Sequence, residues 1–183
     1  MFDLINGLPV HPLVVHAVVV LVPLAALGTI AIALRPAWRS TYGPLVVAAG
    51  ILSVILCPVA TSSGEALEER VGSPGEHAEL GDQLVWFVVP VAVLALALVL
   101  LERRRTPAGH RTGPSGRGGD GATPTSAASS PVALKVVAAL AVLAALATSF
   151  QVYRVGDSGA KAVWHGQVSS SGDGSGDTSG SDD

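Results

Sequence analysis

Four long apolar stretches constrain this sequence more than any other feature. A helix needs about 20 apolar residues to cross a hydrocarbon core of about 30 Å. Four segments approach or exceed that length with no Asp, Glu or Arg in their interiors. Backbone polar groups in lipid must be bonded within their own segment, which favours helices. The predicted spans cover about residues 13–34, 43–60, 84–101 and 131–153.

The composition agrees with a membrane protein. The chain is 49% hydrophobic and only 14% charged, which is outside the usual range of soluble domains. The one cysteine, Cys57, excludes an intrachain disulfide and a cysteine-rich metal site within one chain. Residues 1–9 carry no Lys or Arg. The first span therefore lacks the basic flank of a cleaved signal peptide and is predicted to be retained.

The basic residues predict the direction of the spans. Eight of the eleven Lys and Arg residues flank one side of the four predicted spans, and twelve of the fourteen Asp and Glu residues lie on the other. Connections rich in Lys and Arg stay in the cytoplasm. Both termini are therefore predicted to be extracytoplasmic. The eight basic residues are Arg35, Arg39, Arg103, Arg104, Arg105, Arg111, Arg117 and Lys135.

The predicted fold is all-α: a four-helix transmembrane bundle with up-down-up-down topology. Residues 1–168 form the membrane domain in this prediction. Segment 106–130 is rich in Gly, Ser, Thr and Pro and is predicted to be a disordered cytoplasmic linker. The tail 169–183 is almost entirely Ser, Gly and Asp and is predicted to be disordered outside.

The outer connection between the second and third spans carries its own signals. Pro58 and the polar residues 61–63 predict the end of the second helix, and 65–71 predicts a short surface helix. Ser73 and Glu76 have the spacing of a capping box, with Pro74 at the first helical position. The third helix is therefore predicted to begin at Pro74.

Four of the five histidines fall on the predicted outer side: His11 and His16 near the first span, His77 before the third, and His165 after the fourth. Imidazole is a ligand for zinc, copper and haem iron, and helix bundles often hold such sites. These four histidines are the candidate cofactor ligands, with His16, His77 and His165 as the candidate metal set. His110 lies in the linker.

Each histidine also has a structural interpretation. His11, before Pro12, would simply precede the first helical turn. His16 lies about 8 Å below the start of the span, where an ionisable residue usually faces the bundle interior and has a partner. A hydrogen bond to a neighbouring helix would explain it equally well. His77 stands among acidic residues that suit a solvated face, and His165 beside Trp164 suits an interfacial anchor.

Several short motifs resemble those of a known family of bacterial membrane proteins, domain of unknown function family 2231. The resemblance covers most of the chain apart from the linker and tail, and it implies a four-helix membrane module whose histidines suit a haem or metal role. The closing motif of that family often reads Gly-His-x-Gly, whereas Asp157 stands at the histidine position here, with His165 nearby. The matching segments are Leu8–His16, with its HPxxVH opening, Ala60–Glu65, Glu76–Asp82 and Gly156–Trp164.

Two functions from different classes follow. The first is an integral membrane protein in the bacterial cell membrane that binds haem or a divalent metal ion through the outer histidines, with electron transfer to another membrane or redox protein. The second is a cofactor-free structural or partner-binding module, since small residues such as 138–147 suit close helix packing. No catalytic motif is found, so an enzyme is not favoured, and nucleic acid is an improbable partner beside membrane spans. An oligomer is compatible with either function.

Overall fold

The computed structural model describes residues 4–5, 8–71, 75–105 and 131–171, and the side chains of 11–68, 75–105 and 131–161. Within these residues the fold is helical apart from a two-residue strand pair at the start and one 3-10 turn. The elements are β1 Leu4–Ile5, β2 Leu8–Pro9, α1 Val10–Leu34, η1 Pro36–Trp38, α2 Arg39–Val71, α3 Glu76–Arg105 and α4 Pro131–Ser171.

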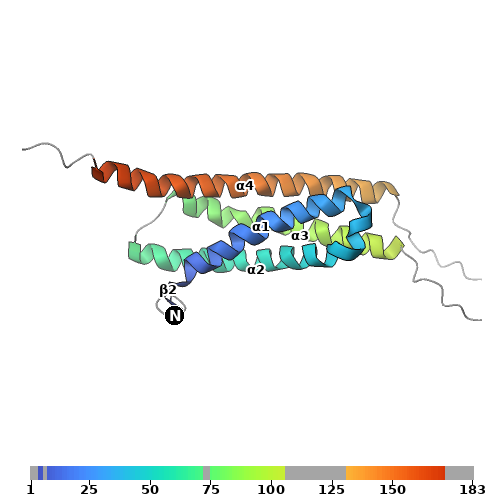
Figure 1. The fold of residues 1–183 in the computed structure, drawn as a ribbon, viewed down its shortest axis with the longest axis horizontal. Helices are drawn as coiled ribbons and strands as arrows, with labels where there is room; N and C mark the ends of the chain where they lie inside the picture. The colour runs from blue at the N-terminus through green and yellow to red at the C-terminus, as the bar shows by residue number, and fades with distance from the viewer. Residues whose placement is uncertain (1–3, 6–7, 72–74, 106–130, 172–183) are drawn as a thin grey trace, which may run out of the picture.

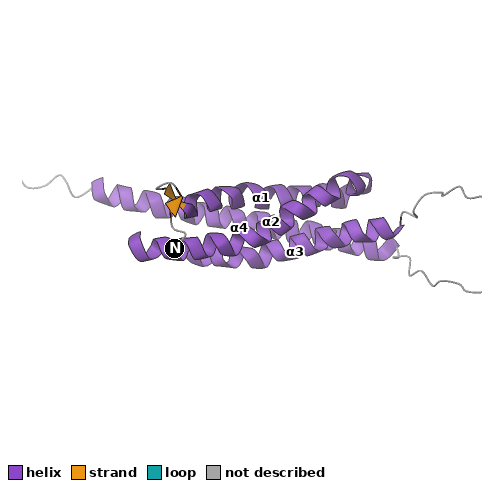
Figure 2. Cartoon of the chain, turned by 90° about the horizontal axis from the view of Figure 1, so that it is seen from below, coloured by secondary structure: helices purple, strands orange, loops and turns teal. Residues whose placement is uncertain are grey.

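The helices form an antiparallel bundle, which confirms the predicted fold class. They run along one common long axis and reverse direction at each connection (Figures 1 and 2). Helix α1 packs on α2 and α4, α3 packs on the same two helices, and α1 also touches α3 across the bundle. The histidine-bearing starts of α1 and α3 therefore lie at one end, and the arginine-rich ends of these helices lie at the other (Figure 1).

Among the described residues, four helices are long and apolar enough to cross a membrane. Their outward faces carry large apolar side chains, as expected where lipid replaces water as the solvent. A bilayer is therefore the environment of this protein, and the chain is a multi-pass membrane protein. Exposed examples from the four helices are Leu27, Leu45, Val93, Leu143 and Phe150.

The helices are longer than the predicted spans, chiefly at the histidine end of the bundle. Helix α2 continues through Pro58 and residues 61–71, so the predicted helix break and the separate surface helix are both wrong. Proline removes one backbone hydrogen bond, and the neighbouring bonds carry the helix past Pro58. Helix α4 continues to Ser171, past the predicted end at 153 and three residues into the predicted disordered tail.

Helix α3 begins at Glu76 rather than at Pro74. Gly75 has a φ of 61°, a left-handed conformation that glycine adopts without steric cost, and its carbonyl accepts a hydrogen bond from Ala78 N. The predicted capping box depends on Ser73 and Pro74, which lie outside the described residues. The predicted linker 106–130 and the tail from residue 172 onward also lie outside them.

A buried arginine ties the first three helices together at the arginine-rich end. Arg39 is 3% exposed, and its guanidinium donates hydrogen bonds to the carbonyls of Ile32 and Ala33 and to the Glu102 carboxylate on α3. The last carbonyls of a helix have no partner within that helix. Arg39 therefore satisfies two carbonyls near the end of α1 while its charge is balanced by Glu102, 3.0 Å away.

The buried positions of α1 recur in α3 at one constant spacing along the chain. Each of the seven buried residues of α1 has a buried counterpart in α3, and His11 at the start of α1 pairs with His77 at the same spacing. The equivalent pairs are Val18 and Leu84, Val22 and Val88, Ala25 and Val91, Ala26 and Ala92, Thr29 and Ala95, Ile32 and Leu98, and Ala33 and Val99.

A second constant spacing relates α2 to α4. Ser53 and Thr148 are both buried, and each hydroxyl donates to the carbonyl four residues earlier in its helix. The same spacing pairs buried Val46 with Ala141. The hairpin α1–α2 and the hairpin α3–α4 are therefore two versions of one packing pattern, arranged about an axis that runs along the bundle.

Candidate functional site

His11 links the start of α1 to α2. Its Nδ1 lies 3.1 Å from the Ala60 carbonyl and 3.0 Å from Ser63 Oγ. The Ser63 hydroxyl itself donates to Ala60 O, and a Cβ added at Gly64 would lie 3.0 Å from the imidazole Cε1. The half-buried ring is therefore held by two oxygen atoms and packs closely against a glycine that leaves room for it.

His77 makes the same set of contacts between α3 and α4. Its Nδ1 lies 3.0 Å from the Val155 carbonyl and 3.3 Å from Ser158 Oγ. The Ser158 hydroxyl donates to Val155 O, and a Cβ at Gly159 would lie 3.0 Å from both Cε1 and Nδ1 of the ring. His77 is half buried, so the prediction that it belongs to a solvated acidic face is wrong.

The two histidine sites are equivalent by both spacings of the repeat. His11 and His77 are related by the α1-to-α3 spacing, and their partners Ser63 and Ser158 are related by the α2-to-α4 spacing. Each imidazole occupies the second position of its helix, and both helices begin at the same end of the bundle (Figure 1). The fold therefore places two histidines from segments far apart in the sequence at the same end of the bundle, each bonded to a different helix.

The hydrogen bonds determine which ring nitrogen remains available. A carbonyl oxygen can only accept, so Nδ1 carries the proton in both rings, and in a neutral imidazole Nε2 then has a free lone pair. Within the described part of the chain, Nε2 of His11 and of His77 has no hydrogen-bond partner. A carbonyl bond at one nitrogen is also the usual way to orient a histidine whose other nitrogen binds a metal.

His16 does not join this pair. Its Nδ1 bonds the Pro12 carbonyl one turn earlier in α1, and the residue is exposed, so the predicted interior position is wrong. Residues advance by about 100° around a helix, and His16 precedes buried Val18 by two positions. It therefore projects from nearly the opposite side of α1.

The side chain of the remaining predicted ligand, His165, is not placed by the structure. The His165 side chain and all of His110 lie outside the described residues. Among the residues that are described, no group of three or more His, Cys, Asp or Glu side chains could share a metal ion. The ligand roles of His11, His16, His77 and His165 stay predictions, with His11 and His77 the pair whose surroundings are alike.

The residues that hold these histidines were not identified as such from the sequence. Ser63-Gly64 and Ser158-Gly159 are the same dipeptide, placed near the histidine end of α2 and α4. A Ser-Gly pair is common in loops and predicts little by itself. Here one Ser-Gly pair follows the second apolar span and the other follows the fourth. A histidine stands before the first span and another before the third, so the same order of histidine, two spans and Ser-Gly occurs twice. That repetition would have been a usable signal.

Comparison with known proteins gives a family for the chain. No curated protein and no solved structure matches the sequence. The sequence model of the family described as "Predicted membrane protein (DUF2231)" matches residues 7–172, which include all four helices and the resolved histidines. The predicted resemblance is confirmed: this chain belongs to the DUF2231 family of predicted membrane proteins.

Proposed function

We propose that this protein binds a haem at the histidine end of its bundle, where Nε2 of His11 and Nε2 of His77 would be the protein ligands of the iron. The observation that carries the proposal is the matched anchoring of both Nδ1 atoms on backbone carbonyls of the following helix. Each ring is thereby fixed in orientation, with its other nitrogen free to bind a metal.

Two imidazoles suit a haem better than a zinc ion. A structural zinc site needs four protein ligands and a catalytic one needs three, and the described residues hold no such group. A haem iron already has four porphyrin nitrogens and needs only axial ligands from the protein. When bound, a haem with two such ligands would supply one-electron transfer, and this chain's residues would orient the ligands and shield the iron from water.

We infer that the site faces the outside of a bacterial cell. The arginine-rich end carries Arg35, Arg103, Arg104 and Arg105, and such ends stay in the cytoplasm. Both termini would then be extracytoplasmic, and a redox protein of the membrane or its outer side would be the partner. A reporter fused after residue 183 should be located outside the cytoplasm. A reporter inserted in segment 106–130 should be located in the cytoplasm. The reverse pattern would refute this orientation.

Absorption spectra of the purified protein test the haem directly. Protein produced with added haem precursor should show a Soret band and the low-spin spectrum of two imidazole ligands. His11→Ala and His77→Ala should each lose the low-spin signature, because each would remove one of the two imidazoles that hold the iron. His16→Ala is the matched control on the same helix and should leave the spectrum unchanged, since His16 is exposed on another face.

A second set of variants separates loss of a ligand from loss of folding. Ser63→Ala and Ser158→Ala remove one hydrogen-bond partner of each ring and keep both imidazoles. These variants should retain the Soret band with weaker haem affinity. Protein that stays helical and colourless after reconstitution with haem in micelles would refute the proposal, and so would an equal spectral change in His16→Ala.

A cofactor-free partner-binding module is the second candidate. It is favoured by the hydrogen bonds themselves, because a bond from an imidazole to the next helix stabilises each hairpin whether or not a ligand is bound. In that case the histidine variants would change only the stability of the bundle, and the protein would copurify with another membrane component.

A further inference from the structure

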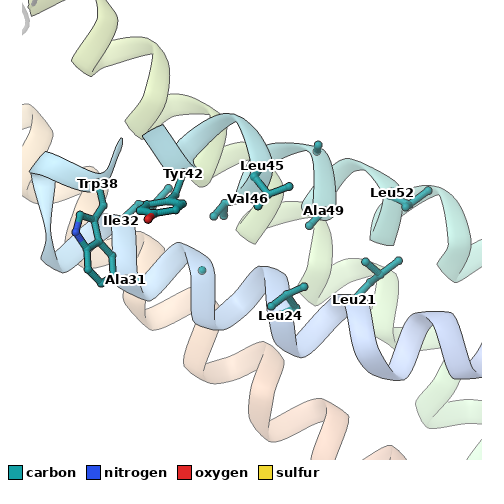
Figure 3. Close-up of a pocket in the computed structure, with 12 residues that line it drawn as sticks. Leu21, Leu24, Ala31, Ile32, Trp38, Tyr42, Leu45, Val46, Ala49 and Leu52 are labelled. Carbon is teal, nitrogen blue, oxygen red and sulfur yellow. The ribbon is translucent and has the colours of Figure 1, made fainter. Parts of the chain in front are cut away.

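The arginine-rich end of the bundle bears a groove between α1 and α2 that the histidine site does not use. Its volume is about 500 Å³, within the usual range for ligand sites. It opens on the outer surface of the bundle, and its walls are almost entirely apolar (Figure 3). Its lining residues include Leu21, Leu24, Gly28, Tyr42, Ala48 and Leu52.

Small residues create this groove, and the second hairpin lacks them. Gly28 and Ala48 line it. By the two spacings of the repeat, the equivalent residues are Leu94 on α3 and Leu143 on α4. A leucine in place of the exposed Ala48 would occupy the groove, whereas a Cβ at Gly28 would lie 2.7 Å from Val46, so Gly28 allows α1 and α2 to approach closely beside the groove. The groove is therefore a property of α1 and α2 and not of the packing pattern that the two hairpins share.

The end of the groove nearest the η1 turn carries aromatic rings and a positive charge. Trp38 and Tyr42 line it with their rings in edge-to-face contact, 5.7 Å between centroids. The exposed Arg35 guanidinium lies 4.9 Å from the Trp38 ring centroid. Within the described residues Arg35 forms no ion pair with a carboxylate. Tryptophan and tyrosine favour the membrane interface, so this end lies at headgroup level.

The length of the groove matches one leaflet. Leu21 and Ile32, at its two ends on α1, are eleven residues apart, which corresponds to about 16 Å along a helix. Half of a hydrocarbon core is about 15 Å. An apolar groove that starts beside the exposed Arg35 at the interface and ends near mid-membrane has the shape and polarity to hold a phospholipid headgroup and one acyl chain.

We propose that the α1–α2 groove binds an anionic phospholipid of the leaflet at the arginine-rich end. One acyl chain lies along Gly28 and Ala48, and the phosphate pairs with Arg35 beside Trp38. Arg103, Arg104 and Arg105 in the last turn of α3 add positive charge at the same end of the bundle. This charge favours a lipid with a net negative headgroup over a zwitterionic one.

Quenching of Trp38 fluorescence by brominated lipids tests this site. Trp86→Phe combined with Trp164→Phe leaves Trp38 as the only tryptophan, and the protein is reconstituted in phosphatidylcholine with rising fractions of brominated phosphatidylglycerol or brominated phosphatidylcholine. Brominated phosphatidylglycerol should quench Trp38 at about fivefold lower mole fraction, the preference expected from one basic side chain at an anionic surface. A protein with Trp86 as its only tryptophan, on an exposed face of α3, should show no preference.

Two variants assign the preference to the groove. Arg35→Gln should make the two brominated lipids equal, and Ala48→Leu should lower the quenching of Trp38 by both because it fills the groove as Leu143 does in the second hairpin. Ala139→Leu, at an exposed position of α4, is the control and should have no effect. Equal quenching by both lipids in the parent protein would overturn the proposal. A second copy of the chain would be the occupant if neither lipid quenched Trp38 and the protein formed a dimer that Ala48→Leu dissociates. That result would also overturn the lipid proposal.

Discussion

The close contact between His77 and Gly159 makes a sharp stability prediction. A methyl group at Gly159 would lie 3.0 Å from Cε1 and Nδ1 of His77, which is closer than carbon atoms normally pack. The ring must move, and movement weakens its hydrogen bond to the Val155 carbonyl. Gly156, one turn earlier on α4, has no atom within 4 Å of an added Cβ and is the matched control.

The magnitudes follow from three terms. Replacing a helical glycine by alanine stabilises by about 0.8 kcal/mol where there is space, so Gly156→Ala should raise the free energy of unfolding by that amount. At Gly159 the same gain is opposed by about 1 kcal/mol for the hydrogen bond and by about 1 kcal/mol for overpacking. Gly159→Ala should therefore destabilise by about 1 kcal/mol, which places the two variants about 2 kcal/mol apart.

Reversible unfolding of the purified protein in mixed micelles, followed by circular dichroism, measures both values. A double-mutant cycle isolates the imidazole as the cause: in a His77→Ala background, Gly159→Ala should stabilise as Gly156→Ala does, because the ring is gone. Equal stabilisation by Gly159→Ala and Gly156→Ala in the parent protein would refute a steric conflict between the imidazole and Gly159. Destabilisation by Gly159→Ala in the absence of His77 would refute it as well.

Three further variants test other parts of the bundle by the same unfolding measurement. Arg39→Leu should destabilise by about 3 kcal/mol, because it removes the guanidinium that bonds the Glu102 carboxylate and two carbonyls of α1; an unchanged midpoint would show that the buried ion pair contributes no net stability. Glu102→Gln should cost less, about 1 kcal/mol, because a neutral amide oxygen can still accept from the guanidinium. Thr148→Val should cost about 0.6 kcal/mol by removing the hydrogen bond to Phe87 O on α3, and a stabilised variant would contradict that contact.

The membrane spans could be predicted from the sequence, but the helix ends outside the apolar core could not. Inside a bilayer every backbone group must be bonded within its helix, so an apolar run of sufficient length leaves one solution. Outside the core, helices continue as long as packing and hydrogen bonds support them, and hydropathy carries no signal about where that stops. Helix α2 passes Pro58 and continues to Val71 for this reason.

The orientation of the histidines could not be predicted because the spans are apolar on every side. In a soluble bundle an amphipathic pattern shows which face of a helix is buried. In α1, buried Val22 and exposed Leu24 are equally apolar, so the sequence does not distinguish His11, on the buried side, from His16, on the opposite side. Polar residues were the remaining signal, since buried Ser53 and Thr148 mark the inner faces of α2 and α4.

The repeat also explains why the two matched histidines lie at the same end of the bundle. A unit of two spans begins and ends on the same side of the membrane, so a second copy joined after it must enter in the same direction, giving repeats related by an axis along the membrane normal. A residue at the start of the first unit then shares its membrane side with the equivalent residue of the second. The two histidine sites remain equivalent. At the other end of the bundle the equivalence is lost, because the second hairpin has Leu134 at the position of Arg39 and Leu94 at the position of Gly28, beside the groove. The two ends of the bundle therefore differ: the histidine end keeps two equivalent histidine sites, whereas the arginine-rich end has its buried arginine and its groove in the first hairpin.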